Sequence, residues 1–209
     1  MKKLLMIALV AGFGFTTAQA QEVKLGAKAG VNFAKLTGDD VEDADGRTGF
    51  HIGVLAEIPF AEKWAIQPEI LYSQQGLQSK EDFFDGEIES KLILDYINIP
   101  VMVKYYLTDA LSVEGGPQFG FRAKAEQEIE ITGSNDDGDG IEGTTDLKDS
   151  ISGFDAGVGG GLAYQLNNGL FLQARYVIGL TNVNADDDEG AFGDDLTNSN
   201  LSFSLGYKF

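Results

Sequence analysis

Apolar residues recur at every second position along most of the chain after residue 21, and this alternation constrains the fold more than any other feature. The C-terminal stretch shows it well, because the residues at 201, 203, 205, 207 and 209 are all apolar or aromatic. A period of two places successive side chains on opposite faces of a strand. Similar runs occupy seven further segments: 23–33, 50–60, 64–73, 97–106, 111–122, 154–165 and 170–181. The pattern predicts eight strands, each with one apolar and one polar face.

The connections between these strands alternate between short and long. Tight links lie at 61–63, 108–110 and 167–169, and long polar segments lie at 35–48, 78–91, 126–150 and 184–198. Short periplasmic turns that alternate with long extracellular loops, with an even strand count, are typical of a transmembrane β-barrel. We therefore expect an all-β, eight-stranded antiparallel up-and-down barrel in a bacterial outer membrane, with both termini on the periplasmic side.

A soluble barrel of the lipocalin kind is the alternative fold, because its strands alternate as well. A soluble barrel keeps its apolar face inward. In this chain one face is almost continuously apolar, whereas the other carries charges of both signs, which favours a polar lumen surrounded by lipid. The charged residues on that second face are Lys24, Lys28, Glu57, Glu69, Lys104, Glu114, Arg122, Lys124, Arg175 and Lys208.

One local irregularity appears in this pattern. Leu92, Leu94 and Tyr96 are out of phase with the apolar positions that follow from Ile97 onward. An extra residue in one strand shifts the phase of a pair, so we expect a β-bulge near Tyr96.

The first twenty residues predict an export signal. Lys2 and Lys3 precede an apolar stretch, and Ala18-Gln19-Ala20 has the small residues of a cleavage site. An uncleaved anchor helix is disfavoured, because the apolar stretch is shorter than the roughly 20 residues that span a bilayer. We expect residues 1–20 to be a signal peptide and residues 21–209 to form the barrel domain.

Charge and cysteine content exclude several classes of protein. Without Lys2 and Lys3 the chain has 13 basic and 33 acidic residues, a net charge of −20. Nucleic acid is not expected as a partner, since phosphate binding needs a basic face. The chain has no cysteine, so sheet closure, core packing or the membrane must stabilise it without disulfides. Of the 33 acidic residues, 25 lie in the four long segments, which predicts acidic extracellular loops.

Four segments resemble a known family. They are "YINIPVMVKYYL" (96–107), "GGPQFGF" (115–121), "GVGGGLAYQL" (157–166) and "RYVIGLTNV" (175–183). They are similar to the PorT-like outer membrane protein beta-barrel domain, often labelled porin family, and more distantly to OmpX and the OmpA barrel. The resemblance covers essentially residues 21–209 and implies an outer-membrane barrel of a Gram-negative envelope. It carries over no catalytic or binding residue, and a fold does not determine an activity.

The inward charges are the first candidate site. The interior of an eight-stranded barrel is just wide enough to be filled by side chains. Pairing among inward charges would plug the lumen, whereas unpaired ones could line a narrow conductive path. We expect the plugged state, and with it a structural or interaction role; a small passive pore for solutes is the alternative. The residues of the expected network are Glu57, Glu69, Lys104, Glu114, Arg122 and Arg175.

The third long segment contains a calcium-loop pattern. The stretch 135–140, "NDDGDG", fits D-x-[DN]-x-[DN]-G and is followed by Asp146 at the twelfth position. The oxygen ligands would be Asn135, Asp137, Asp139 and Asp146. Asn in place of the first Asp, Asp in place of the bidentate Glu, and flanking strands in place of helices depart from the pattern. A solvated acidic loop is the favoured interpretation of this segment and calcium binding is the alternative, and no other cofactor is expected.

His51 is the only histidine and is predicted to lie inward, where a lone histidine is usually a hydrogen-bonded lumen residue, so we expect no enzyme.

Tyr207 and Phe209 end the closing strand and resemble the C-terminal signal that the outer-membrane assembly machinery recognises. An aromatic girdle at the lipid interface explains these two residues equally well. We expect a monomer whose partners are lipid and, during biogenesis, that machinery.

Overall fold

The structure is a computed structural model, and it describes residues 22–37, 45–83, 86–133, 141–148, 150–184 and 196–209. The predicted signal peptide lies outside these ranges. The described residues form nine strands: β1 (Lys24–Thr37), β2 (Asp45–Ala61), β3 (Trp64–Phe83), β4 (Gly86–Tyr106), β5 (Leu111–Gly133), β6 (Ile141–Asp146), β7 (Phe154–Gln165), β8 (Leu170–Gly179) and β9 (Thr197–Lys208). None of the described segments is a helix with the length and apolar character needed to cross a membrane.

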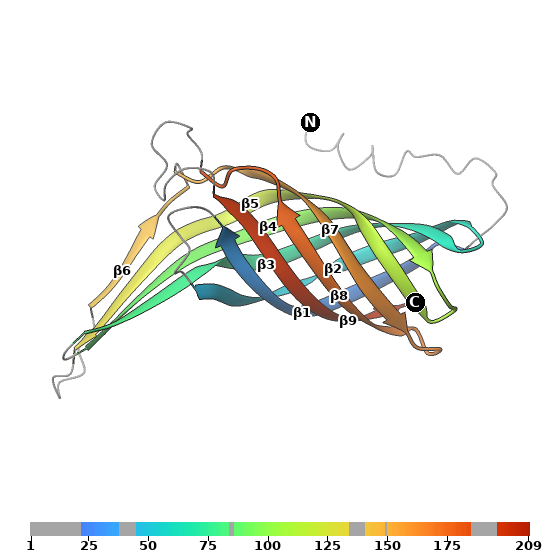
Figure 1. Cartoon of the computed structure of the whole chain (residues 1–209), viewed down its shortest axis with the longest axis horizontal. Coiled ribbons are helices and arrows are strands. Elements are labelled where there is room, and N and C mark those ends of the chain that lie inside the picture. The colour runs from blue at the N-terminus through green and yellow to red at the C-terminus, as the bar shows by residue number, and fades with distance from the viewer. Residues whose placement is uncertain (1–21, 38–44, 84–85, 134–140, 149, 185–195) are drawn as a thin grey trace.

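Eight of the nine strands close into a ring (Figure 1). The order is β4-β3-β2-β1-β9-β8-β7-β5, and a pairing between β4 and β5 completes the circle. The first and last strands pair from Gly26 with Lys208 to Thr37 with Thr197, and the amide of Phe209 donates to the carbonyl of Leu25 at 2.8 Å. A closed ring has no free edge. The prediction of an eight-stranded antiparallel up-and-down barrel is confirmed.

The ninth strand corrects the prediction for the long segments. The segment 126–150 was expected to be a loop, but β5 continues to Gly133 and β6 pairs with it from Glu126 to Ile131. The segment 78–91 is likewise a continuation of β3 and β4 as far as the pair Phe83–Gly86. We call the part of β3, β4, β5 and β6 beyond the ring the extension; it reaches to the left in Figure 1. Its strands are rich in charged and polar residues, and this composition is why the sequence indicated loops here.

The outer wall of the ring is apolar, as the alternation predicts. Leu25, Val54 and Leu205 are 59%, 56% and 57% exposed. Such a wall suits lipid and contradicts the soluble alternative, which would bury these side chains. Aromatic pairs stand near both ends of the wall, including Trp64 with Tyr105 at 4.7 Å between ring centroids and Phe33 with Phe203 at 6.2 Å.

An apolar core fills the ring where it meets the extension. It consists of Leu36, Leu92, Leu94, Tyr96, Ala125, Ile151, Val183 and Leu196, all buried. The predicted bulge near Tyr96 is confirmed: Asp95 pairs with Lys124 but Tyr96 pairs with Arg122, which leaves Ala123 of β5 as the extra residue. Leu92, Leu94 and Tyr96 are out of phase with the lipid-facing residues because they face the inside of the barrel. This apolar core occupies the inside of the barrel at the extension end.

Gly206 of β9 matters for the packing at the opposite end, where the short turns lie. A Cβ at this position would overlap the buried ring of Phe171 and would lie 2.7 Å from the carbonyl oxygen of Ala27. Phe171 is only 2% exposed, so its ring has little room to move.

We predict that Gly206→Ala lowers the free energy of unfolding by roughly 1–3 kcal/mol, because it overpacks the lumen. The urea midpoint of the refolded barrel in detergent micelles measures this loss. Gly160→Ala is the matched control, since a Cβ there faces outward and its nearest neighbour is 3.7 Å away. Equal losses in both variants would contradict the packing argument.

Candidate functional site

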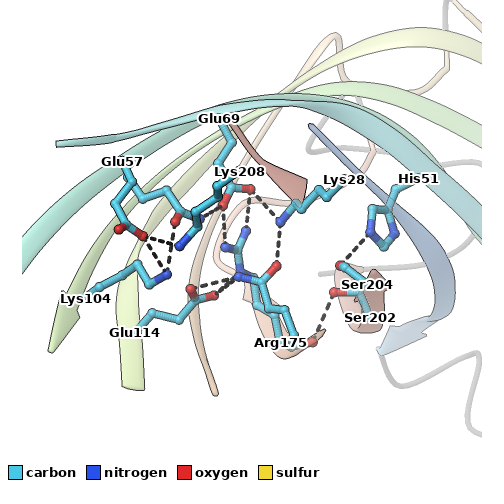
Figure 2. Close-up of polar contacts among 12 residues, drawn as sticks. Lys28, His51, Glu57, Glu69, Lys104, Glu114, Arg175, Ser202, Ser204 and Lys208 are labelled. Carbon is cyan, nitrogen blue, oxygen red and sulfur yellow. Dashed lines mark hydrogen bonds and ion pairs between the residues drawn. The ribbon is translucent and has the colours of Figure 1, made fainter. Parts of the chain in front are cut away.

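The inner wall of the barrel gathers seven buried charged side chains. Every ring strand except β7 contributes one of them, because inward positions alternate with lipid-facing ones along each strand. All seven are at most 6% exposed: Lys28, Glu57, Glu69, Lys104, Glu114, Arg175 and Lys208. We call this set the lumen charge network; Figure 2 shows its members converging from different strands.

Four members form a central group around Arg175. The guanidinium of Arg175 donates to both oxygens of Glu69, at 2.9 Å and 2.7 Å, and through Nε to Glu114 at 2.7 Å. Lys28 lies 2.7 Å from Glu69, and the amide of Gln173 donates to Glu114 at 2.8 Å and 2.9 Å. Two carboxylates thus face two cations, with bidentate geometry at Glu69. The central group is balanced in charge and bridges opposite walls of the lumen.

The other three members form a turn-end group, which lies nearer the short turns. The ammonium groups of Lys104 and Lys208 both approach Oε2 of Glu57, at 3.0 Å and 2.6 Å. The hydroxyl of Tyr106 donates to the other oxygen of Glu57 at 2.6 Å. In this group Lys104 and Lys208 therefore share one carboxylate, that of Glu57.

A neutral polar layer lies between the central group and the apolar core. His51 is hydrogen-bonded through Nδ1 to Asn32 and through Nε2 to Ser204, both at 2.8 Å. The cavity in this layer measures about 10 Å³, which is room for about one water molecule. Both ring nitrogens of His51 are hydrogen-bonded to neutral side chains, so the arrangement is that of a satisfied buried imidazole. Charge network, polar layer and apolar core thus follow one another along the lumen, from the turn end to the extension end.

A funnel of about 610 Å³ opens at the turn end of the barrel. Glu57, Tyr106 and Gln165 line its inner part, and the turns around its mouth contribute Lys63 and Asp109. The funnel ends at the turn-end group, where the packed lumen begins.

Most of the network residues predicted from the sequence lie together, but Arg122 does not. Glu57, Glu69, Lys104, Glu114 and Arg175 belong to the lumen charge network, whereas Arg122 donates to the carbonyl oxygen of Ile151. Eight residues separate Arg122 from Glu114 along β5, roughly 26 Å at the rise of a strand. The prediction that Arg122 joins the network is wrong, because facing the same side of the sheet does not place two residues at the same height.

The sequence marked Lys28 and Lys208 as inward but did not assign them to the network. The pairing of β1 with β9 brings both strands beside the glutamates. Their position on the charge-bearing face was the signal that could have included them.

The predicted calcium ligands Asn135, Asp137 and Asp139 lie outside the described residues. Asp146 is the last residue of β6, is exposed, and accepts hydrogen bonds from the backbone amide and the ammonium of Lys148, both at 2.9 Å. These bonds hold the pKa of Asp146 below its usual range. Within the described ranges, no three His, Asp or Glu side chains are grouped so as to hold a metal ion.

The predicted assembly-signal residues stand on the outer wall at the turn end. Tyr207 and Phe209 are 43% and 79% exposed, and their ring centroids lie 5.5 Å apart. Exposed aromatic rings at this height fit a lipid interface.

Comparison with known proteins identifies the relatives of this fold. The family model described as "Outer membrane protein beta-barrel domain" matches residues 18–184. The crystal structure of Neisserial surface protein A is similar over 90% of this chain and 100% of that chain, with 12% identity and a TM-score of 0.50. Ail of Yersinia pestis gives 12% identity over 90% of this chain and all of its own, with a TM-score of 0.48. At such identities these structures show the fold alone. No curated protein matches the chain.

We predict that Arg175→Met lowers the free energy of unfolding by about 3–5 kcal/mol, because it leaves Glu69 and Glu114 buried without their shared cation. Urea unfolding of the refolded barrel measures the change. Arg122→Met serves as the control and should cost only about 1 kcal/mol, the value of one hydrogen bond to a backbone carbonyl. Similar losses for the two arginines would contradict the central role of Arg175.

Proposed function

We propose, from the premise that this chain belongs to the outer membrane protein beta-barrel domain family, that it is a closed barrel with a structural or interaction role in the bacterial envelope. The observation that carries the proposal is the lumen charge network. Seven charged side chains from seven strands meet each other inside the barrel and are at most 6% exposed. Buried side chains that pair across the lumen fill the space that a conducting path would need.

The interaction part of the proposal rests on the extension. Acidic residues on neighbouring strands stand directly opposite each other there, as Glu89 does with Glu130 and Glu126 does with Asp146. Lys91 and Lys80 offset part of this charge, at 3.1 Å and 3.4 Å from Glu89. Like charges placed opposite on a sheet repel each other. We infer that the extension stands outside the cell and offers a negative surface to ions or partners.

The remaining parts of the proposal follow from the same architecture. The short turns and the termini face the periplasm, the barrel acts as a monomer in lipid, and Tyr207 with Phe209 provides the signal for the assembly machinery. We assign no catalytic step, because the imidazole of His51 is held by Asn32 and Ser204. The narrower PorT-like relationship stays a prediction.

A small passive pore is the second candidate, and the funnel is the feature that favours it. A cavity of about 610 Å³ leads from the turn end to Glu57, as the vestibule of a pore would. Opening such a pore would require the lumen charge network to separate.

The two candidates differ in conductance. We expect the refolded mature protein to insert into a planar bilayer without stable openings, because the network and the apolar core block the lumen. Single-channel recording measures this, and the heat-dependent mobility of the folded barrel on a gel verifies that the sample is folded. Steady ohmic openings would refute the closed barrel and support the passive pore.

We also propose that the segment 135–146 binds calcium weakly, with a dissociation constant of about 10⁻⁴–10⁻³ M, as in extracellular sites. Calorimetric titration of the refolded barrel measures the affinity. The double variant Asp137→Asn, Asp139→Asn should abolish binding, because it removes two charged ligands. Asp109→Asn at the turn end is the control, and its affinity should match that of the parent. Binding that survives the double variant would place calcium elsewhere.

A further inference from the structure

The lumen charge network has one more cation than it has carboxylates. Lys28, Lys104, Arg175 and Lys208 stand against Glu57, Glu69 and Glu114, all of them buried. The surplus positive charge can be assigned to one of the two groups of the network. The central group is balanced, with two carboxylates and two cations. The excess positive charge therefore belongs to the turn-end group, where Glu57 alone serves Lys104 and Lys208.

Neutral groups stabilise these two lysines without balancing their charge. Lys104 donates to Gln67 at 3.1 Å and lies 5.6 Å from the ring centroid of Tyr106. Lys208 donates to Gln165 at 2.7 Å and lies 5.3 Å from the ring centroid of Phe171. Amide oxygens and ring faces attract a cation but carry no net charge. In a water-poor lumen the remaining positive charge attracts an anion more strongly than it would in bulk water.

The funnel ends one side chain away from this surplus charge, since Lys104 and Lys208 are buried and do not line it. The residues between the lysines and the funnel are Glu57, Tyr106 and Gln165, each of which lines the funnel and contacts at least one of the two lysines. Lys24 and Lys63 line it as well, and neither forms an ion pair with any described residue. Two carboxylates at the mouth, Glu62 and Asp109, oppose an anion. They stand in the exposed turns, where water and salt screen them more than the buried lysines.

We propose that the funnel is a binding site for a small oxyanion, of the carboxylate or phosphate class. The anion enters from the turn end and contacts Lys24 and Lys63 directly. Through Gln165 and Tyr106, which lie between, it also compensates the surplus positive charge of Lys104 and Lys208. This site lies beyond the proposed function, because a closed barrel can bind an anion in its mouth without conducting it.

Titration with inorganic phosphate tests the proposal. The refolded mature protein is held in micelles of an uncharged detergent, at constant ionic strength, and its amide resonances are followed by NMR. We expect saturable shifts at Lys63, Thr108 and Asn167 around the funnel, with a dissociation constant on the order of 1 mM. Resonances near His51 and Ser90 should stay in place. Uniform shifts or no saturation would overturn the proposal.

Three variants locate the charge that attracts the anion. Lys208→Gln leaves Glu57 with a single lysine and should weaken phosphate binding roughly tenfold, since a buried charge acts through a low effective dielectric. Lys104→Gln removes the same surplus from a different strand and keeps the test decisive if Lys208→Gln fails to fold. Lys35→Gln, at the opposite end of β1, is the control and should bind as the parent does. Parental affinity in a folded Lys208→Gln or Lys104→Gln barrel would refute the site.

A second titration, with an anionic lipid, distinguishes a dissolved oxyanion from a lipid headgroup. Phosphatidylglycerol added to the micelles should not reproduce the shifts, because the funnel opens inside the ring of strands. If the lipid competes with inorganic phosphate at the same resonances, a membrane-inserted headgroup is the occupant, and entry from the water phase is refuted.

Discussion

Lipid offers no hydrogen-bond partners, so a chain crossing it must satisfy every backbone amide and carbonyl within its own sheet. Two pairings make this possible in the present barrel: β1 with β9, the first and last strands of the chain, and β4 with β5. Once the ring is closed, the outer wall must be apolar, and the polar half of each strand has only the lumen to face. The lumen charge network is a consequence of that closure.

The network in turn makes the register of the strands specific. A slip of one residue between two strands would turn inward residues toward lipid. For β8 such a slip would expose Arg175 to hydrocarbon and leave Glu69 and Glu114 without their cation, which is a large penalty in a low-dielectric interior. Burying charge is costly in itself. It is tolerated here because Glu69 is paired with Arg175 of β8 and Lys28 of β1. Glu114 in turn accepts hydrogen bonds from two residues of β8, Gln173 and Arg175.

The alternation of apolar and polar residues predicts the ring strands, where lipid and lumen impose different chemistry on the two faces of each strand. Leu25, Val54 and Leu205 were assigned to the outer wall because lipid and lumen impose a clear period of two. The extension escaped prediction because its strands are rich in charged and polar residues, as long loops also are. Arg122 was misplaced because alternation gives the face of a residue but not its height along the barrel. The apolar core includes Ile151, Val183 and Leu196 from outside the regular ring strands, where no period guides prediction.

The ring has walls of very unequal length. β5 has 23 residues and β8 has 10, so one side of the barrel continues roughly 43 Å farther along the strand direction than the other. β3, β4 and β5 run without interruption from the tip of the extension to the lumen, where they carry Glu69, Lys104 and Glu114. A partner that pulls on the tip along the strands would load these ladders in shear, with many hydrogen bonds sharing the force. Force applied at the tip would thus reach the membrane-embedded ring through the same strands that hold its charged interior.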